Sequence, residues 1–387
     1  MLEENFLISF TEEQIAVQET IRKFAKDRIA PHIMEWDETQ IFPMEIMQES
    51  GEMGFMGILV PEEYGGAGLG YTDFALIIEE LARVDPSVAL SVAAHNGLCT
   101  NHIAMFGDVE QKRKYLPALA SGKAIGAWGL TESVSGSDAA GLISTAIKDE
   151  NVYVLNGSKT FTTHGTVGSV FVVLARTDQS HTSKGISAFI LEKGMPGLVA
   201  LKKENKLGMR ASDTTQLLFE NVHIPQQNLI GAEGEGFQQA MKILEGGRIS
   251  IAALSMGLAQ GALDHARKYM SERKQFGKPL ADFQSLQFKI ADMTTNIEAA
   301  RLLTYKAASL KDKGKSAAKE AAIAKLFASE IAEKAAAEAV QIFGGYGFIK
   351  DFPVEKLYRD VKLLTIGEGT SEVQRLVIAK KVLEEFS

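Results

Sequence analysis

FQQAMKILEGGRISIAALSMGLAQGALDHARKYMSERKQFG, residues 237–277, is the stretch that decides the fold. Its apolar residues recur at helical spacing over a length that exceeds an ordinary globular helix. A second long helical pattern follows at residues 283–312, and a third begins at Ala317. The third pattern has one apolar face, which carries Ile323, Leu326, Phe327 and Ile331. Because long antiparallel helices imply a bundle, the sequence predicts a helical bundle over residues 236–387.

A different texture precedes the predicted bundle. The segments 151–163, 169–177, 184–193 and 214–225 are short and rich in β-branched and aromatic residues, with Gly, Asn and Pro between them. Regular spacing of such segments without intervening helices is typical of an all-β module. We therefore expect a β domain over residues 125–235.

The first third of the chain has helical patterns again. Thr11 and Gln14 have the spacing of a capping box, and the apolar stripe that follows (Ile21, Phe24, Ala25) ends before Pro31. Two further helices are predicted in 43–55 and 73–86, on either side of a glycine-rich loop. The order of helices, strands and helices predicts an α+β protein with domains at residues 1–124, 125–235 and 236–387.

Composition limits the possible functions. The chain has 387 residues and a net charge of −8, so it lacks the basic surface that nucleic-acid binding requires. Cys99 is the single cysteine, which excludes an intramolecular disulfide and a cysteine-rich metal site. The acidic start, MLEENFLISFTEEQ, is neither a signal peptide nor a transit peptide, and no apolar run could span a bilayer. We expect a soluble cytoplasmic protein without nucleic-acid partners or membrane insertion.

LLTIGEGTSEVQR, residues 363–375, places Glu368 between two glycines just ahead of a predicted helix. Ser371 and Gln374 have capping-box spacing, so we expect Glu368 in the loop before this helix. The glycines allow close approach of a ligand and unusual dihedral angles. The alternative is a surface turn with an ordinary solvated glutamate.

Four other segments combine polar, aromatic and glycine residues: 128–141, 158–165, 273–280 and 341–348. Each has an ordinary structural explanation when taken alone, as a polar loop, a core strand, a helix end with basic residues or a glycine C-cap. Residues 220–223 contain a single E-x-x-H in a strand pattern, whereas a di-iron bundle needs two copies on helices. We expect no metal site.

Taken together in this order and spacing, TESVSGSD, KTFTTHG, RKQFGKPL, QIFGGYGF and IGEGTSEVQR resemble the acyl-CoA dehydrogenase flavoprotein family. The likeness is greatest to its short-chain, butyryl-CoA branch and covers roughly residues 10–385. The resemblance implies an N-terminal helical domain, a β-barrel-like middle domain and a C-terminal four-helix bundle, assembled as a homotetramer.

The resemblance also implies FAD as the cofactor. The residues expected at the flavin are Trp128, Leu130, Thr131, Ser137, Phe161, Thr162, Thr163, Thr370 and Glu372. Those expected to hold the pyrophosphate and adenosine of the FAD of a neighbouring subunit are Arg273, Phe276, Gln284, Gln341, Gly344 and Gly345. Those expected at the acyl-CoA are Ser137, Glu245, Arg248 and Gly369, with Ala94 and Gly367 lining the acyl pocket.

By the same resemblance Glu368 takes the α-proton of an acyl-CoA thioester while the β-hydride goes to flavin N5. The product is the 2-enoyl-CoA, and the electrons go to electron-transfer flavoprotein. Burial should raise the pKa of Glu368 toward a useful basicity. The Gly369 amide would stabilise the enolate-like charge.

Three positions depart from the family pattern. Ser133 and Val134 replace a usual Pro-Gly pair, and His164 replaces an asparagine. Gly367 replaces a tyrosine that packs on the acyl chain, which suggests room for bulkier acyl groups.

Three alternatives remain open: an acyl-CoA oxidase, a nitroalkane oxidase, and a flavin-binding protein without catalysis. The length and the intact GEGT favour the dehydrogenase, and a retained Glu368 argues against a non-catalytic role.

Overall fold

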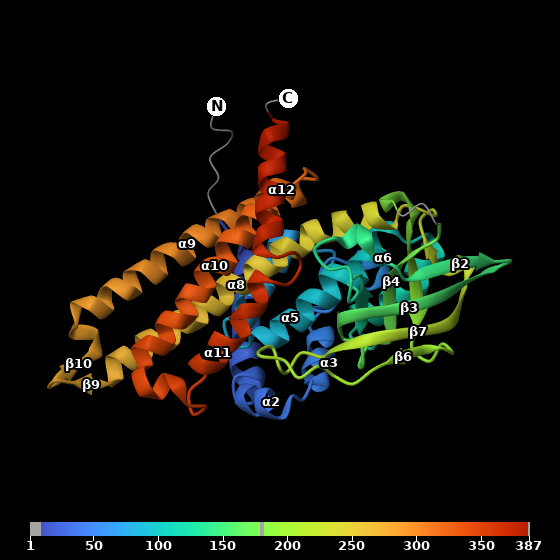
Figure 1. Cartoon of the computed structure of the whole chain (residues 1–387). Helices are drawn as coiled ribbons and strands as arrows, with labels where there is room; N and C mark the ends of the chain where they lie inside the picture. The colour runs from blue at the N-terminus through green and yellow to red at the C-terminus, as the bar shows by residue number, and fades with distance from the viewer. Residues whose placement is uncertain (1–8, 179–181, 386–387) are drawn as a thin grey trace.

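The N-terminal helices lie against both the middle sheet and the C-terminal bundle (Figure 1). This computed structural model describes residues 9–178 and 182–385. The first eight residues, part of the acidic start discussed above, lie outside the described residues. The order of helices, then strands, then helices matches the α+β prediction.

The N-terminal part contains seven α-helices among the described residues, interrupted by short π and 3₁₀ turns. They are α1 (Glu12–Phe24), α2 (Ile33–Thr39), α3 (Met44–Glu52), α4 (Tyr71–Ala82), α5 (Pro86–Ala94), α6 (Asn101–Phe106) and α7 (Val109–Ala120). Thr11 accepts from the Gln14 amide and Gln14 bonds back to Thr11, so the predicted capping box is confirmed. The predicted stripe of Ile21, Phe24 and Ala25 is buried.

The middle part is one mixed sheet. Its strands are β1 (Gly126–Gly129), β2 (Thr145–Asp149), β3 (Val152–Thr163), β4 (Val170–Arg176), β5 (Ile186–Glu192), β6 (Leu198–Ala200), β7 (Thr214–Pro225) and β8 (Leu229–Ile230). Their order is β6-β7-β3-β2-β4-β5-β8, and β1 runs parallel to β4. The four predicted strand segments are confirmed.

The sheet curls around its own core. Tyr153 of β3 and Phe189 of β5 lie on strands that are not neighbours, yet their ring centroids are 4.9 Å apart. The opposite side of β4 and β5 packs on α6, α7 and α8 through Val172, Ile103 and Ala240. The sheet is therefore held between its own core and the helices, which fixes β1 and β3 relative to the rest of the molecule.

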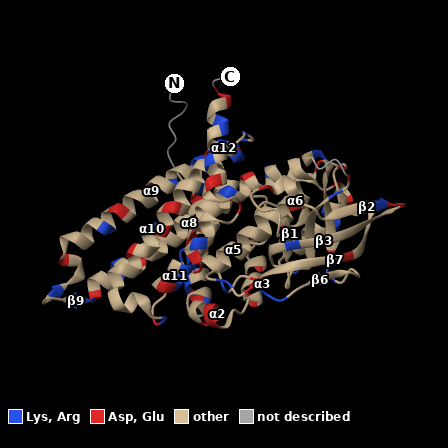
Figure 2. Cartoon of the chain, in the orientation of Figure 1, with Lys and Arg blue, Asp and Glu red and all other residues tan. Residues whose placement is uncertain are grey.

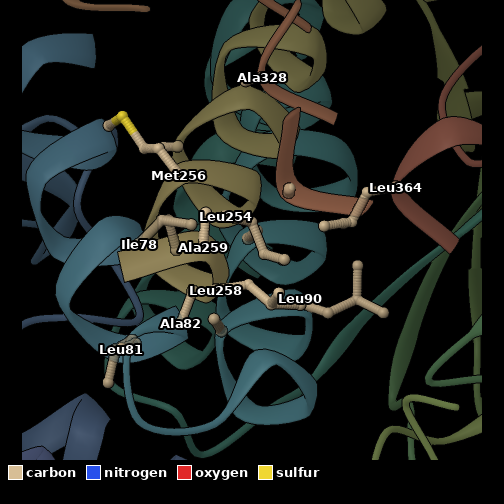
Figure 3. Close-up of a cluster of buried hydrophobic side chains, with 14 of the residues drawn as sticks. Ile78, Leu81, Ala82, Leu90, Leu254, Met256, Leu258, Ala259, Ala328 and Leu364 are labelled. Atoms are coloured by element: carbon tan, nitrogen blue, oxygen red, sulfur yellow. The ribbon is translucent and has the colours of Figure 1, made fainter. Parts of the chain in front are cut away.

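The C-terminal part is the predicted bundle. Its elements are α8 (Gly236–Glu272), the hairpin β9 (Lys274–Gln275) and β10 (Lys278–Pro279), α9 (Gln284–Asp312), α10 (Ala318–Phe343), α11 (Val354–Asp360) and α12 (Ser371–Glu384). Leu254 and Leu258 of α8 pack with Ile78 of α4, Leu90 of α5 and Leu364 (Figure 3). The N-terminal helices and the bundle therefore share one core.

The buried face of α10 differs from the expected one. Ile331 is buried, but Ile323, Leu326 and Phe327 are only half-buried. The residues that face α8 are small, and they include Ala321, Ala324, Ala328, Ala332 and Ala336. Alanines let two helix backbones approach closely, so the large side chains lie at the margin of the contact.

Ion pairs and a backbone hydrogen bond join all three parts near α11. Arg359 of α11 bonds both carboxylate oxygens of Asp37 in α2, at 2.6 and 3.2 Å. Lys356 donates to Asp360 at 2.6 Å and to Asp85 at 3.3 Å, and Asp360 accepts from the Met209 amide. Elsewhere the charges of both signs are interspersed along the helices (Figure 2).

None of the helices within residues 9–178 and 182–385 combines the length and apolar character that a membrane span requires.

Candidate active site

Glu368 lies in the short loop that leads into α12, as the sequence predicts. Its φ is +52° and that of Gly369 is +94°, so two successive residues adopt left-handed backbone. This conformation is strained for a glutamate and persists only where the surroundings hold it. Gly367 does not have a positive φ, so its role is not conformational.

The start of α12 is shifted by one residue from the prediction. Thr370 is the N-cap, and its hydroxyl accepts from the Val373 amide at 3.3 Å. Ser371 is the first helical residue, so the predicted Ser371–Gln374 capping box is wrong. Gln374 instead donates from Nε2 to the Gly369 carbonyl at 2.9 Å. Gln374 therefore bonds the loop five residues before it rather than the helix end.

The Glu368 carboxylate points at α8. A Cβ at Gly247 would lie 1.9 Å from Glu368 Oε2, so only glycine leaves room for this carboxylate. Oε2 is enclosed and has no hydrogen-bond partner among the described residues. Burial raises the pKa of Glu368 to about 7, against the opposing effects of Lys325 and Arg248. A carboxylate with this pKa is suited to taking a proton near neutral pH.

The other residues predicted to contact acyl-CoA differ in their burial and in their hydrogen-bond partners. Arg248 of α8 is buried, and its Nε has no partner among the described residues. Glu245 accepts at Oε1 from Lys311 Nζ and from the Ala317 amide, both at 3.1 Å. It therefore ties α8 to the α9–α10 connection. Ser137 is exposed on the loop between β1 and β2.

The turn that follows Ala94 and the Glu368 loop both reach α8 at Gly247. Ala94 is buried at the end of α5, and the chain continues as a π turn that contains Leu98. Leu98 lies 3.6 Å from the position of a Gly247 Cβ, beside the Glu368 carboxylate. A Cβ at Gly367 would meet Leu363 at 3.4 Å, which is an ordinary contact.

Most of the predicted flavin-facing residues lie where β1 and β3 meet, whereas Thr370 and Glu372 lie at the start of α12. The Thr160 amide donates to the Thr131 carbonyl at 2.8 Å. Beside it Phe161 has a φ of +53° within a register shift of β3, and its side chain is 70% exposed. A bulge with left-handed backbone re-aims a side chain away from the sheet. Thr162 is buried, and its hydroxyl has no partner among the described residues.

Two residues that sequence reasoning missed support this group. Lys159, fully buried, donates to Glu132 Oε1 at 2.6 Å and to the Leu130 carbonyl at 3.1 Å. Glu132 in turn accepts from the Ile143 and Ser144 amides at 2.6 and 3.0 Å. This pair fixes the loop that carries Leu130 and Thr131. Ser133 and Val134 lie on the exposed turn beside it.

Three buried histidines form hydrogen bonds with β1, two with the Gly126 main chain and one with the Trp128 side chain. His95 Nδ1 accepts from the Gly126 amide at 3.0 Å, and His164 Nδ1 donates to the Gly126 carbonyl at 2.9 Å. His102 Nδ1 accepts from the Trp128 indole at 3.0 Å. Of these, only His164 was noted in the sequence. It lies beneath the strand and not at the surface.

The remaining predicted cofactor residues form a second group. The Arg273 guanidinium lies 5.5 Å above the Tyr346 ring. This contact joins the β9–β10 hairpin to the end of α10, the region that carries Gln341, Gly344 and Gly345. Phe276, at the hairpin tip, is 92% exposed with a φ of +52°. This hairpin and the β-sheet lie at opposite ends of the molecule (Figure 1). One chain therefore does not bring the two groups together.

Comparison with known proteins assigns each part of the chain to one and the same protein family. Family models match the acyl-CoA dehydrogenase N-terminal domain at residues 11–123, the middle domain at 127–222 and the C-terminal domain at 234–383.

Three relatives illustrate the likeness. The short-chain-specific acyl-CoA dehydrogenase of Clostridium acetobutylicum is 49% identical over 97% of this chain and 99% of its own. A subunit of the caffeyl-CoA reductase–Etf complex of Acetobacterium woodii is 43% identical over 97% of this chain and 100% of its own. The structure of butyryl-CoA dehydrogenase from Megasphaera elsdenii superposes with a TM-score of 0.96 at 43% identity, over 98% of this chain and 100% of that one.

Proposed function

This chain belongs to the acyl-CoA dehydrogenase family and is an oxidoreductase, and from that premise we propose that it oxidises an acyl-CoA thioester to the 2-enoyl-CoA. The observation that carries the proposal is the Glu368 carboxylate, which is enclosed, without a hydrogen-bond partner among the described residues, and has a raised pKa. The family and the fold agree with it, but this carboxylate supplies the chemistry.

Glu368 acts as the general base. It removes the proton from Cα of the thioester, while the hydride leaves Cβ, so that one C=C bond replaces two C–H bonds. FAD, when bound, supplies the acceptor for that hydride. The glycine at position 247 leaves the carboxylate room on α8, and its enclosure keeps water from competing for the proton.

Negative charge that develops on the thioester oxygen needs a donor. The Gly369 amide, held in left-handed backbone directly after Glu368, is the proposed donor. Arg248 is the nearest buried cation on α8, and we propose that it orients the carboxylate and the thioester. Ser137 and Glu245 remain proposed contacts of the CoA portion.

The residues at β1 and β3 fit a flavin. Phe161 presents an exposed ring from a strained bulge, and Thr162 offers a buried hydroxyl without a partner among the described residues. We propose that Trp128, Leu130, Thr131 and Thr163 complete this side, with Thr370 and Glu372 at the start of α12. A planar ring with polar edges needs such a mixture of faces and donors.

The adenosine half of FAD is proposed to bind at the other group, in a neighbouring subunit of a homotetramer. Arg273, Phe276, Gln284, Gln341, Gly344 and Gly345 are exposed in the single chain. Phe276 and Phe348 expose 92% and 89% of their surface at that end of the molecule, and such apolar exposure favours burial against a second subunit. Sedimentation or light scattering of the FAD-loaded protein tests the tetramer.

Electron-transfer flavoprotein is the proposed electron acceptor, and one relative is named as part of an Etf complex. The rival reaction is that of an oxidase, which would reoxidise the flavin with oxygen. Hydrogen peroxide released at the rate of flavin reduction would identify the oxidase. The cytoplasmic location and the domain limits at residues 124/125 and 235/236 remain predictions.

For the substrate we propose a preference for acyl groups bulkier than butyryl. Gly367 lacks the tyrosine side chain of straight-chain relatives, and Ala94 is small. A relative named for caffeyl-CoA is consistent with bulk, whereas a short-chain-specific relative argues the other way. A panel of straight, branched and aromatic acyl-CoAs compares kcat/KM. Gly367→Tyr, whose Cβ fits beside Leu363, should shift the preference toward butyryl-CoA.

The test of the proposed function is the flavin spectrum. The FAD-loaded protein should lose its yellow colour when acyl-CoA is added without air. Glu368→Gln should keep the colour and the fold but lose at least 10²–10⁴-fold in the rate of bleaching. Bleaching of this variant at the wild-type rate would show that Glu368 is not the base.

A further inference from the structure

A buried lysine faces the loop that carries Glu368. Lys325 lies on α10, its side chain is 0% exposed, and its Nζ donates to the Gly369 carbonyl at 2.7 Å. Burying an ammonium group costs free energy unless charges or good hydrogen bonds compensate. Burial lowers the pKa of Lys325 to about 8, while Glu368 opposes this effect.

The same carbonyl accepts a second hydrogen bond from a neutral donor. Gln374 Nε2, from α12, lies 2.9 Å from the main-chain carbonyl oxygen of Gly369 and 3.4 Å from that of Glu368. The loop is thus held from α10 on one side and from α12 on the other. Two successive residues with positive φ need such support, because they otherwise relax to ordinary backbone.

A neutral donor would satisfy this carbonyl as well as a lysine does, so the charge needs its own explanation. The ionisable groups that act on Lys325 come from each element around it: Glu368 from the loop, Arg248 from α8, Glu372 from α12 and Glu330 from α10 itself. Glu368 is the largest of these influences after burial. Lys325 in turn is the largest of the influences that oppose the effect of burial on the pKa of Glu368.

We propose that Lys325 is a positioning residue that holds the Glu368 loop through Gly369 and keeps the Glu368 carboxylate ionised in the working pH range. Gln374 performs only the first of these tasks. The proposal rests on the proposed role of Glu368 as the base. Positioning and charge are separable, because Gln374 contributes the hydrogen bond without the charge.

The experiment compares three variants of the FAD-loaded protein. Lys325→Gln keeps an amide donor and removes the charge, Lys325→Arg keeps the charge, and Gln374→Leu removes the neutral donor. The rate of flavin reduction by acyl-CoA in a single turnover is measured from pH 5.5 to 9. The rate rises with pH as Glu368 loses its proton, and the midpoint of this rise is the quantity compared.

In Lys325→Gln we expect the midpoint to move up by about one pH unit, which is about a tenfold loss of rate below the midpoint. Lys325→Arg should move it by less than half of that. Gln374→Leu should lower the rate at all pH values without moving the midpoint. An unchanged midpoint in Lys325→Gln, or an equal shift in Gln374→Leu, would overturn the proposal.

A second measurement follows the same titration without catalysis. The free energy of unfolding of Lys325→Gln is compared across pH with that of the double variant Lys325→Gln/Glu368→Gln. The difference between the two curves grows as pH rises above the unfolded-state pKa of Glu368 and levels off at its folded-state pKa. The pH at which it levels off should be higher than in the corresponding wild-type pair. Near wild-type flavin reduction in Glu368→Gln alone would contradict the proposed function, whereas an equal levelling-off pH in the two pairs would contradict only the role of Lys325.

Discussion

Three of the predicted site residues share one backbone feature. Phe161, Phe276 and Glu368 all have φ between +50° and +55°, although none is glycine. Each position costs of order 1–3 kcal/mol in local strain, which the surrounding structure must offset. Phe161 and Phe276 present exposed rings and Glu368 presents an enclosed carboxylate, so at each point strain aims a side chain where ordinary backbone would not.

The raised pKa of Glu368 predicts a stability effect that depends on pH. In the folded protein the pKa is about 7, and its ordinary value is 4.5. Because the folded state holds the proton more tightly, stability is lost as pH rises from about 4.5 to 7, by about 3 kcal/mol in total. Glu368→Gln cannot ionise, so it should be more stable than wild type by about this amount at pH 8.

Urea unfolding of both FAD-loaded proteins at pH 5 and pH 8 measures this difference. At pH 5 the two free energies of unfolding should differ by only about 1 kcal/mol, because Glu368 is then protonated in the folded state and only partly ionised in the unfolded state. Glu333→Gln is the control, since Glu333 of α10 is a partly exposed carboxylate that accepts from Lys362 and Thr365, and it should show no such gain at pH 8. Equal stability of Glu368→Gln and wild type at pH 8 would contradict the enclosure of the carboxylate.

At the scale of elements, the hydrogen bonds that position the Trp128 side chain of β1 form a chain whose donors and acceptors can all be assigned. The Trp128 indole can only donate, so His102 Nδ1 must accept, and its Nε2 then donates to Gln239 Oε1 at 3.0 Å. Gln239 Nε2 donates to the Ile230 carbonyl at 3.0 Å. The direction of each bond follows from the first, and His102 must be neutral. Burial lowers the pKa of His102 to about 4, which agrees.

His102→Leu should therefore release the Trp128 ring. The chain has two tryptophans, so Trp36→Phe leaves Trp128 as the single fluorophore. In that background we expect His102→Leu to shift the emission of Trp128 and to weaken FAD binding about fivefold, since the lost bond is worth of order 1 kcal/mol. His223→Leu, on the exposed side of β7, is the control. Unchanged emission would show that the histidine does not fix the ring.

At the scale of the whole molecule, the ion pairs at α11 join the three parts of the chain. Lys356 and its partners Asp85 and Asp360 are all buried, and they come from α11 and from the start of α5. Burial by itself lowers the pKa of Lys356, but Asp360 and Asp85 outweigh it and raise the pKa above its ordinary value. Removing the lysine would leave two carboxylates buried beside each other.

Lys356→Met should lower the free energy of unfolding by about 3–5 kcal/mol, the usual cost of an uncompensated buried charge. Lys350→Met is the matched control, since Lys350 pairs with Glu38 on the surface and should cost at most about 1 kcal/mol. Urea unfolding at pH 7 compares the two. Similar small losses in both variants would mean that this junction does not stabilise the assembled fold.

The sequence by itself determined the order of helices, strands and helices, since helical and strand periodicities are local properties of the chain. It also placed Glu368 in a loop ahead of the last helix, because the two glycines and the helix start lie within a few residues. The family resemblance supplied the remaining site residues. Of these, Thr131 and Phe161 lie at one end of the molecule and Arg273 lies at the other.

Only the tertiary structure decided what surrounds the site. Lys325 and Gly247 reach Glu368 from distant parts of the sequence, and no local pattern marks either as its neighbour. α10 buries alanines because α8 lies close. In each case the deciding energy comes from a contact between segments far apart in the chain, which the local periodicity does not contain.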